Sequence, residues 1–98
     1  MAQTQKVLVL VTAGNCGHSR QLHQRWTRMR SEIQNQHPSL TIVDIDVPVM
    51  GISVSSLGQP KDLDRYVGWY PTMFLFSRRE WEAAKRGSRL NGTIFNGN

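Results

Sequence analysis

Five consecutive valine and leucine residues, at positions 7–11, constrain the fold of this chain more than any other feature. The run shows no alternation of apolar and polar residues, which is typical of a strand that is covered on both faces of its sheet. It is far shorter than the roughly 18–20 apolar residues that a membrane-spanning helix needs. We therefore predict a buried strand over residues 6–12.

A helix and a second strand are expected next. Residues 19–34 carry four apolar side chains at the spacing of one helical face, which we expect in the core: Leu22, Trp26, Met29 and Ile33. Pro38 ends this helix, because proline disfavours helix at the residue before it. Residues 40–47 are rich in β-branched side chains and predict a second strand. A strand, a helix and a strand in this order predict a parallel pair with a right-handed crossover.

The second half of the chain predicts shorter elements. Residues 60–66 fit a short helix with a proline in its first turn. Residues 72–76 and 93–95 fit a third and a fourth strand. The stretch 77–88 has two interpretations, either a helix that begins with a capping box and stops at Gly87, or the wide turn of a hairpin.

Length and charge limit the classes of protein to consider. Ninety-eight residues make a single domain, and the formal net charge is +5. No aromatic-interleaved basic motif accompanies the arginines, so we expect a solvated surface rather than a nucleic-acid site, with no membrane contact. Three histidines and one cysteine give no convincing metal-ligand set. The first six residues lack the pattern of a secretory signal, which makes a cytoplasmic location our expectation.

Cys16 is the residue that points to chemistry. It follows the first predicted strand and a short turn, and it stands at the start of the predicted helix. Amide N–H groups and the helix dipole at such a position stabilise a thiolate. A cysteine in a turn rich in glycine and polar residues is also expected to be exposed. It is the only cysteine, so it can form no disulfide within this chain.

Two segments of the sequence resemble one known family. Residues 13–22 read Ala-Gly-Asn-Cys-Gly-His-Ser-Arg-Gln-Leu, similar to the Ala-Pro-Trp-Cys-Gly-His-Cys-Lys-x-Leu of protein disulfide isomerases. Residues 67–72 read Val-Gly-Trp-Tyr-Pro-Thr and resemble that family's Val-x-Gly-Tyr-Pro-Thr, with one extra residue. The resemblance implies that residues 1–98 form one thioredoxin-like α/β domain. Its βαβ unit and β-hairpin would make a central mixed sheet flanked by helices, without the family's last helix.

The resemblance also implies a site. Pro71 would be cis and pack against Cys16, and Tyr70 would offer its backbone to an extended substrate. Seven residues receive an expected role: Cys16, His18 and Ser19 in catalysis, and Gly17, Tyr70, Pro71 and Thr72 in substrate binding. Arg20 could attract an anion such as glutathione, although a plain surface arginine is the simpler interpretation.

Two departures from the family narrow the expected chemistry. Ser19 replaces the resolving cysteine, and about where the family has a buried carboxylate this chain has Leu10. Full dithiol cycling is therefore not expected, and whether the domain is an enzyme stays open. Ser19 itself has three interpretations: a hydrogen-bond donor to the Cys16 thiolate, a plain helix N-terminal residue, or an engineered replacement for cysteine.

Three functions follow from these observations. The first is a monothiol domain that forms mixed disulfides through Cys16 with glutathione or a client cysteine. A weaker resemblance, to the Cys-Gly-Phe-Ser of monothiol glutaredoxins, also implies glutathione. The usual lysine before that motif and the later Gly-Gly-Asp are not evident here. The alternative is a thioredoxin-fold binding or structural module without redox activity. A third and weaker interpretation is nucleic-acid binding through the arginines.

Overall fold

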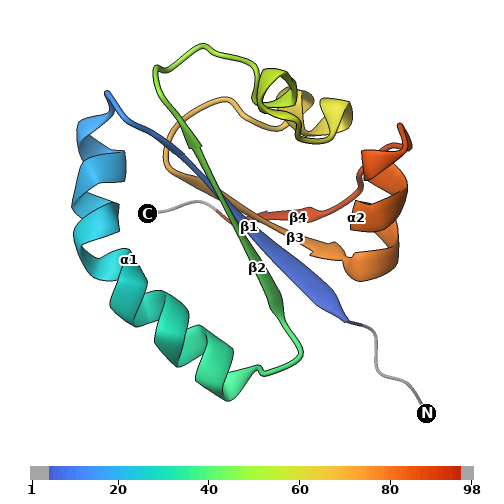
Figure 1. Ribbon diagram of the computed structural model, residues 1–98, viewed down its shortest axis with the longest axis horizontal. Coiled ribbons are helices and arrows are strands. Elements are labelled where there is room, and N and C mark those ends of the chain that lie inside the picture. The colour runs from blue at the N-terminus through green and yellow to red at the C-terminus, as the bar shows by residue number, and fades with distance from the viewer. Residues whose placement is uncertain (1–4, 96–98) are drawn as a thin grey trace.

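A mixed β-sheet lies between helices in the computed structural model, which describes residues 5–95 and the side chains of residues 5–92 (Figure 1). The strands are β1 (Lys6–Ala13), β2 (Thr41–Val47), β3 (Thr72–Ser77) and β4 (Thr93–Phe95). The helices are α1 (Gly17–Gln36) and α2 (Arg78–Lys85), with two 3-10 helices, η1 (Val54–Leu57) and η2 (Lys61–Arg65). Among the described residues, no helix combines the length and the apolar character needed to cross a membrane.

The strand order is β2-β1-β3-β4. β1 and β2 are parallel, with Val7 opposite Thr41, which confirms the predicted parallel pair. β3 runs antiparallel to both β1 and β4. The α/β class and the central mixed sheet flanked by helices are thus confirmed.

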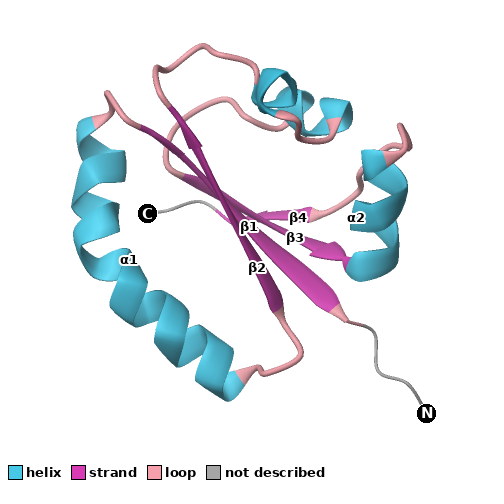
Figure 2. Ribbon diagram, in the orientation of Figure 1, coloured by secondary structure: helices cyan, strands magenta, loops and turns pink. Residues whose placement is uncertain are grey.

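The valine and leucine run forms the middle of the structure. Val7, Val9 and Val11 point to the face that α2, η1 and η2 cover, where Trp81, Ala84, Val54 and Leu63 join them in one core cluster. Leu8 and Leu10 point to the opposite face, under Trp26 of α1. Figure 2 shows α1 on one side of the strands and the shorter helices on the other. Burial on both faces explains why the strand has no polar alternation.

Helix α1 packs less tightly than its sequence pattern predicts. Trp26 is buried, and its Nε1–H donates to Asp44 Oδ1 at 2.6 Å, but Leu22 and Ile33 are only half-buried. Met29 is 37% exposed, so the expectation that it lies in the core was wrong. Helical spacing gives the direction in which a side chain leaves the axis, but not how closely the sheet approaches each turn.

The ambiguous stretch after β3 is a helix rather than a hairpin turn. Ser77 Oγ accepts the backbone N–H of Glu80 at 3.1 Å, which is the N-terminal half of the predicted capping box. Gly87, with a φ of 103°, follows the end of α2 in the left-handed conformation. Residues 60–66 were expected to form a short helix, and the structure has the 3-10 helix η2 there.

Candidate thiol site

Cys16 is the N-cap residue of α1, directly beyond the end of β1. Its backbone is extended, with φ −100° and ψ 122°. Its carbonyl accepts the N–H of Arg20 at 3.1 Å, and its own N–H donates to Ala13 O at 3.1 Å. The turn after β1 therefore leads straight into the first turn of the helix, as the sequence predicted. The backbone N–H groups of His18 and Ser19, in that first turn, act on the sulfur.

The thiol is buried, although the composition of its turn predicted an exposed cysteine. Cys16 is only 8% exposed, and its Sγ lies 3.5 Å from the carbonyl oxygen of Tyr70, which accepts a hydrogen bond from the thiol. The correction has a simple cause. A segment 54 residues away in sequence folds over the turn, and local composition contains no sign of that segment. The Tyr70–Pro71 peptide is cis, which is the geometry that the family resemblance implied.

Hydrogen bonds lower the pKa of the Cys16 thiol below its ordinary value. The largest cause is the backbone N–H of Ser19, which stabilises the thiolate. Burial acts in the opposite direction, and the Ser19 hydroxyl and the backbone N–H of His18 add to the lowering. The contact with Tyr70 O favours the protonated thiol, so losing that proton also frees the Tyr70 carbonyl. The hydrogen bonds from His18 and Ser19 thus favour the thiolate, whereas the Tyr70 carbonyl favours the thiol.

Ser19 connects the sulfur to the sheet. The residue is fully buried, and its Oγ accepts the backbone N–H of Ala13 at 3.1 Å. One acceptor site of the hydroxyl is therefore occupied, and the same hydroxyl lowers the pKa of the Cys16 thiol. Of the three interpretations of Ser19, the hydrogen-bond donor fits these contacts.

The other residues of the motif face solvent. Gly17, His18 and Arg20 are all exposed. Within residues 5–95, no hydrogen bond or ion pair joins the His18 ring to Cys16, and it is the backbone of His18 that acts on the thiol. A Cβ added to Gly17 would meet no atom within 4 Å, so packing does not require a glycine there.

The residues after Tyr70 differ in their access. Pro71 is half-buried, while Thr72 is 2% exposed and pairs with Val11 in the sheet. In the described part of the chain, Thr72 Oγ1 is the one buried side-chain oxygen without a hydrogen-bond partner. Of the four residues expected to bind substrate, Gly17, Tyr70 and Pro71 are accessible, and Thr72 lies in the interior.

Asn15 holds a third loop at the site, and the sequence reasoning gave it no role. Its Oδ1 accepts the backbone N–H of Met50 at 2.9 Å, while Gly14 N donates to Val47 O at 2.8 Å. A Cβ at Gly14 would lie 3.0 Å from Pro48 O, so this close approach favours a glycine. The only local signal was an asparagine in a turn, and its partner lies 35 residues away.

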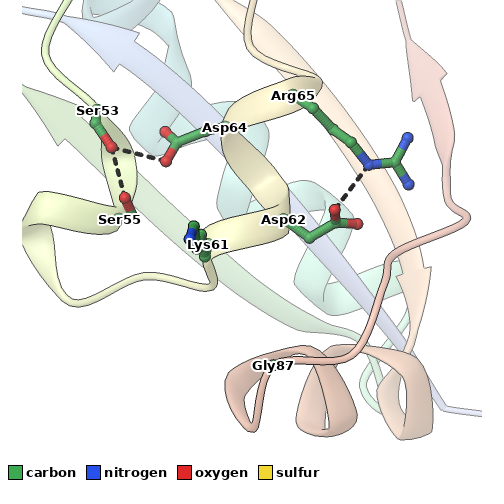
Figure 3. Close-up of a pocket in the computed structure, with 7 residues that line it drawn as sticks. All are labelled: Ser53, Ser55, Lys61, Asp62, Asp64, Arg65 and Gly87. Carbon is green, nitrogen blue, oxygen red and sulfur yellow. Dashed lines mark hydrogen bonds and ion pairs between the residues drawn. The ribbon is translucent and has the colours of Figure 1, made fainter.

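A cleft of about 340 Å³ opens beside Tyr70. It is lined by Gly51, Ile52, Ser53, Asp64, Val67 and Tyr70. A larger cleft of about 640 Å³ shares Ser53 and Asp64 with it and extends toward Lys61, Asp62 and Arg65 (Figure 3). We place the candidate site at the smaller cleft because Tyr70, which contacts the sulfur, lines it.

Two observations concern titratable groups near the site and metal ligands. Leu10 is buried in the apolar cluster under α1, so that position supplies no titratable group. Among residues 5–95, no three His, Cys, Asp or Glu side chains gather as metal ligands would.

No protein-family model matches this sequence, and the search of curated proteins also gave no match.

Proposed function

We propose that this chain is a thioredoxin-like domain with a single reactive thiol, which forms mixed disulfides through Cys16 with glutathione or a client cysteine. The observation that carries the proposal is the 3.5 Å contact between Cys16 Sγ and Tyr70 O. It joins the two segments that resemble protein disulfide isomerases, far apart in sequence. The strand order β2-β1-β3-β4, with the thiol where β1 meets α1, supports the same assignment.

The chemistry uses one sulfur. The Cys16 thiolate attacks one sulfur of a disulfide RSSR, a Cys16–S–S–R bond forms, and RS⁻ leaves and takes a proton from water. Ser19 has no sulfur to attack the new bond, and the chain holds no other cysteine. A second thiol from outside must therefore release Cys16 by the same exchange.

Intact mass after incubation with oxidised glutathione tests the proposal. The expected result is one glutathione adduct on the native protein, removed by a reductant and absent in Cys16→Ala. A native protein that forms no adduct, while the same chain unfolded in urea does, would contradict a reactive native thiol.

That contrary result would support a second function, a binding or structural module without redox activity. The burial of Cys16 at 8% exposure favours it, together with Ser19 and Leu10 at the positions of the lost dithiol chemistry. In that case Cys16→Ala would keep the domain's binding or biological activity unchanged.

A further inference from the structure

The cleft beside Tyr70 has a single charged lining residue. Of its six lining residues, Asp64 is the only one with a carboxylate or a cationic group. Three others present apolar or aromatic surface: Ile52, Val67 and Tyr70. The cleft thus combines an apolar wall with a single negative group, and one of its lining residues, Tyr70, contacts Cys16 through its carbonyl.

Asp64 stays ionised at neutral pH. Ser53 Oγ–H and Val54 N–H each donate to one of its oxygens at 2.7 Å, and Figure 3 shows the first of these bonds. Burial acts to raise the pKa of Asp64, but these bonds and those from Ser55 outweigh it, and the pKa is lowered. Neutral donors stabilise the carboxylate without cancelling its charge, so a bound ligand still experiences an anion.

The cationic side chains of this region either line the larger cleft, which Asp64 also lines, or lie exposed on α1. Lys61 and Arg65 line the larger cleft, and the Arg65 guanidinium is paired with Asp62 at 2.8 Å. His18 and Arg20 are exposed on the first turns of α1. A group that enters the cleft beside Tyr70 therefore meets Asp64 as its nearest lining charge.

Two exposed apolar residues adjoin the lining residues in sequence. Met50 directly precedes Gly51 in the chain and is 47% exposed, and Trp69 directly precedes Tyr70 and is 51% exposed. A cation on an apolar stem, like the side chain of lysine or arginine, complements a wall of this kind.

On the basis of the proposed function, we propose that the Cys16 site selects disulfides with a cationic group on an apolar stem beside the sulfur. Its partner would be a basic client peptide rather than glutathione, whose net charge is negative. The protein's overall charge of +5 predicts the opposite preference, so the two influences can be separated by experiment.

The test uses three small disulfides that differ in charge: cystamine (cationic), 2-hydroxyethyl disulfide (neutral) and oxidised glutathione (anionic). Each rate of adduct formation on the native protein is divided by the rate for a synthetic peptide of residues 12–20. The peptide carries Cys16, His18 and Arg20 but no cleft, so the ratio removes intrinsic reactivity and local charge. We expect the normalised rates to fall from cystamine to the neutral compound to glutathione, by about two- to fivefold per step. The differences between these normalised rates should become smaller at high salt, because salt screens the charge of Asp64.

Asp64→Asn keeps a carbonyl acceptor for η1 and removes the charge. It should reduce the preference for cystamine over glutathione by about two- to fivefold. Glu82→Gln is the matched control, because Glu82 pairs with Lys85 on α2 and lines neither cleft. It should leave the preference unchanged.

Failure of this inference differs from failure of the proposed function. If all three disulfides react but glutathione is fastest after normalisation, the inference is wrong and the reactive thiol stands. An equal effect of Asp64→Asn and Glu82→Gln also contradicts it. If no disulfide reacts with the native protein, both proposals fail. The order of the three normalised rates on the wild-type protein, and their dependence on salt, test the inference even if Asp64→Asn does not fold.

Discussion

Replacing Ser19 with alanine should lower the stability of the fold and raise the pKa of Cys16 at the same time. The Ser19 hydroxyl accepts the Ala13 N–H at 3.1 Å and also helps to lower the Cys16 pKa. Ser19→Ala removes both interactions and leaves the backbone N–H of Ser19, the largest cause of the lowered pKa, in place.

The size of the stability effect follows from burial. Ser19 is 0% exposed and Ala13 is 1% exposed, so no solvent can replace the lost acceptor without local opening. An unsatisfied buried donor costs about 1–3 kcal/mol. For a small domain, whose free energy of unfolding is typically about 5–15 kcal/mol, this is a large fraction.

Urea unfolding and the pH dependence of alkylation measure the two effects. Ser88→Ala removes the same hydroxyl from an exposed residue after α2 and should change stability by less than about 0.5 kcal/mol. The Cys16 pKa in Ser19→Ala should rise above its wild-type value, because the hydroxyl no longer stabilises the thiolate. A stability loss equal to that of Ser88→Ala, with an unchanged pKa, would refute this reasoning.

Three further predictions concern stability. Because the folded pKa of Cys16 is lowered, its thiolate contributes stability that is fully present above the unfolded pKa, about 8.5, and is lost as the pH falls through the folded pKa. Wild type should therefore gain stability over Cys16→Ala as the pH rises through this window, and a difference that does not vary with pH in urea titrations would argue against it. Gly92→Ala would place a Cβ 2.6 Å from Leu75 O and against the Phe76 ring, which should cost about 1–3 kcal/mol. Gly68→Ala, with open space around the added carbon, is the control in thermal unfolding, and equal melting temperatures would contradict the expected clash. Trp26→Phe removes the 2.6 Å hydrogen bond from the indole to Asp44. Asp44 remains paired with Arg30 at 3.0 Å, so the free energy of unfolding measured in urea should fall by only about 1 kcal/mol. Trp69→Phe, at an exposed position, should cost nothing measurable, and parity between these two variants would count against the Asp44 bond.

The sequence predicted the elements and their pairing well because those signals are local. The apolar run of β1, the β-branched β2 and the capping box of α2 each depend on neighbours within a few residues. The parallel arrangement of β1 and β2 then follows from chain connectivity. The helical turn that presents N–H groups to Cys16 follows from the same kind of local signal.

The missed features depend on contacts between distant parts of the chain. The burial of Cys16 comes from Tyr70, in a segment whose approach only the family resemblance implied, and the function of Asn15 comes from Met50. Asp64 joins the cleft because it holds η1, ten residues earlier, through Val54. None of these partners can be identified from local periodicity or composition. The exposure of Met29 has the same origin, since it depends on how closely α1 approaches the sheet.

The pH dependence of the reaction between native Cys16 and a neutral disulfide tests the central claim most directly. Adduct formation, followed by intact mass, should occur on the folded protein and rise with pH to a plateau, with a midpoint below the free-cysteine value of about 8.5. A midpoint at or above that value, or a thiol that reacts only after unfolding, would contradict an activated cysteine beneath the Tyr70–Pro71 bend.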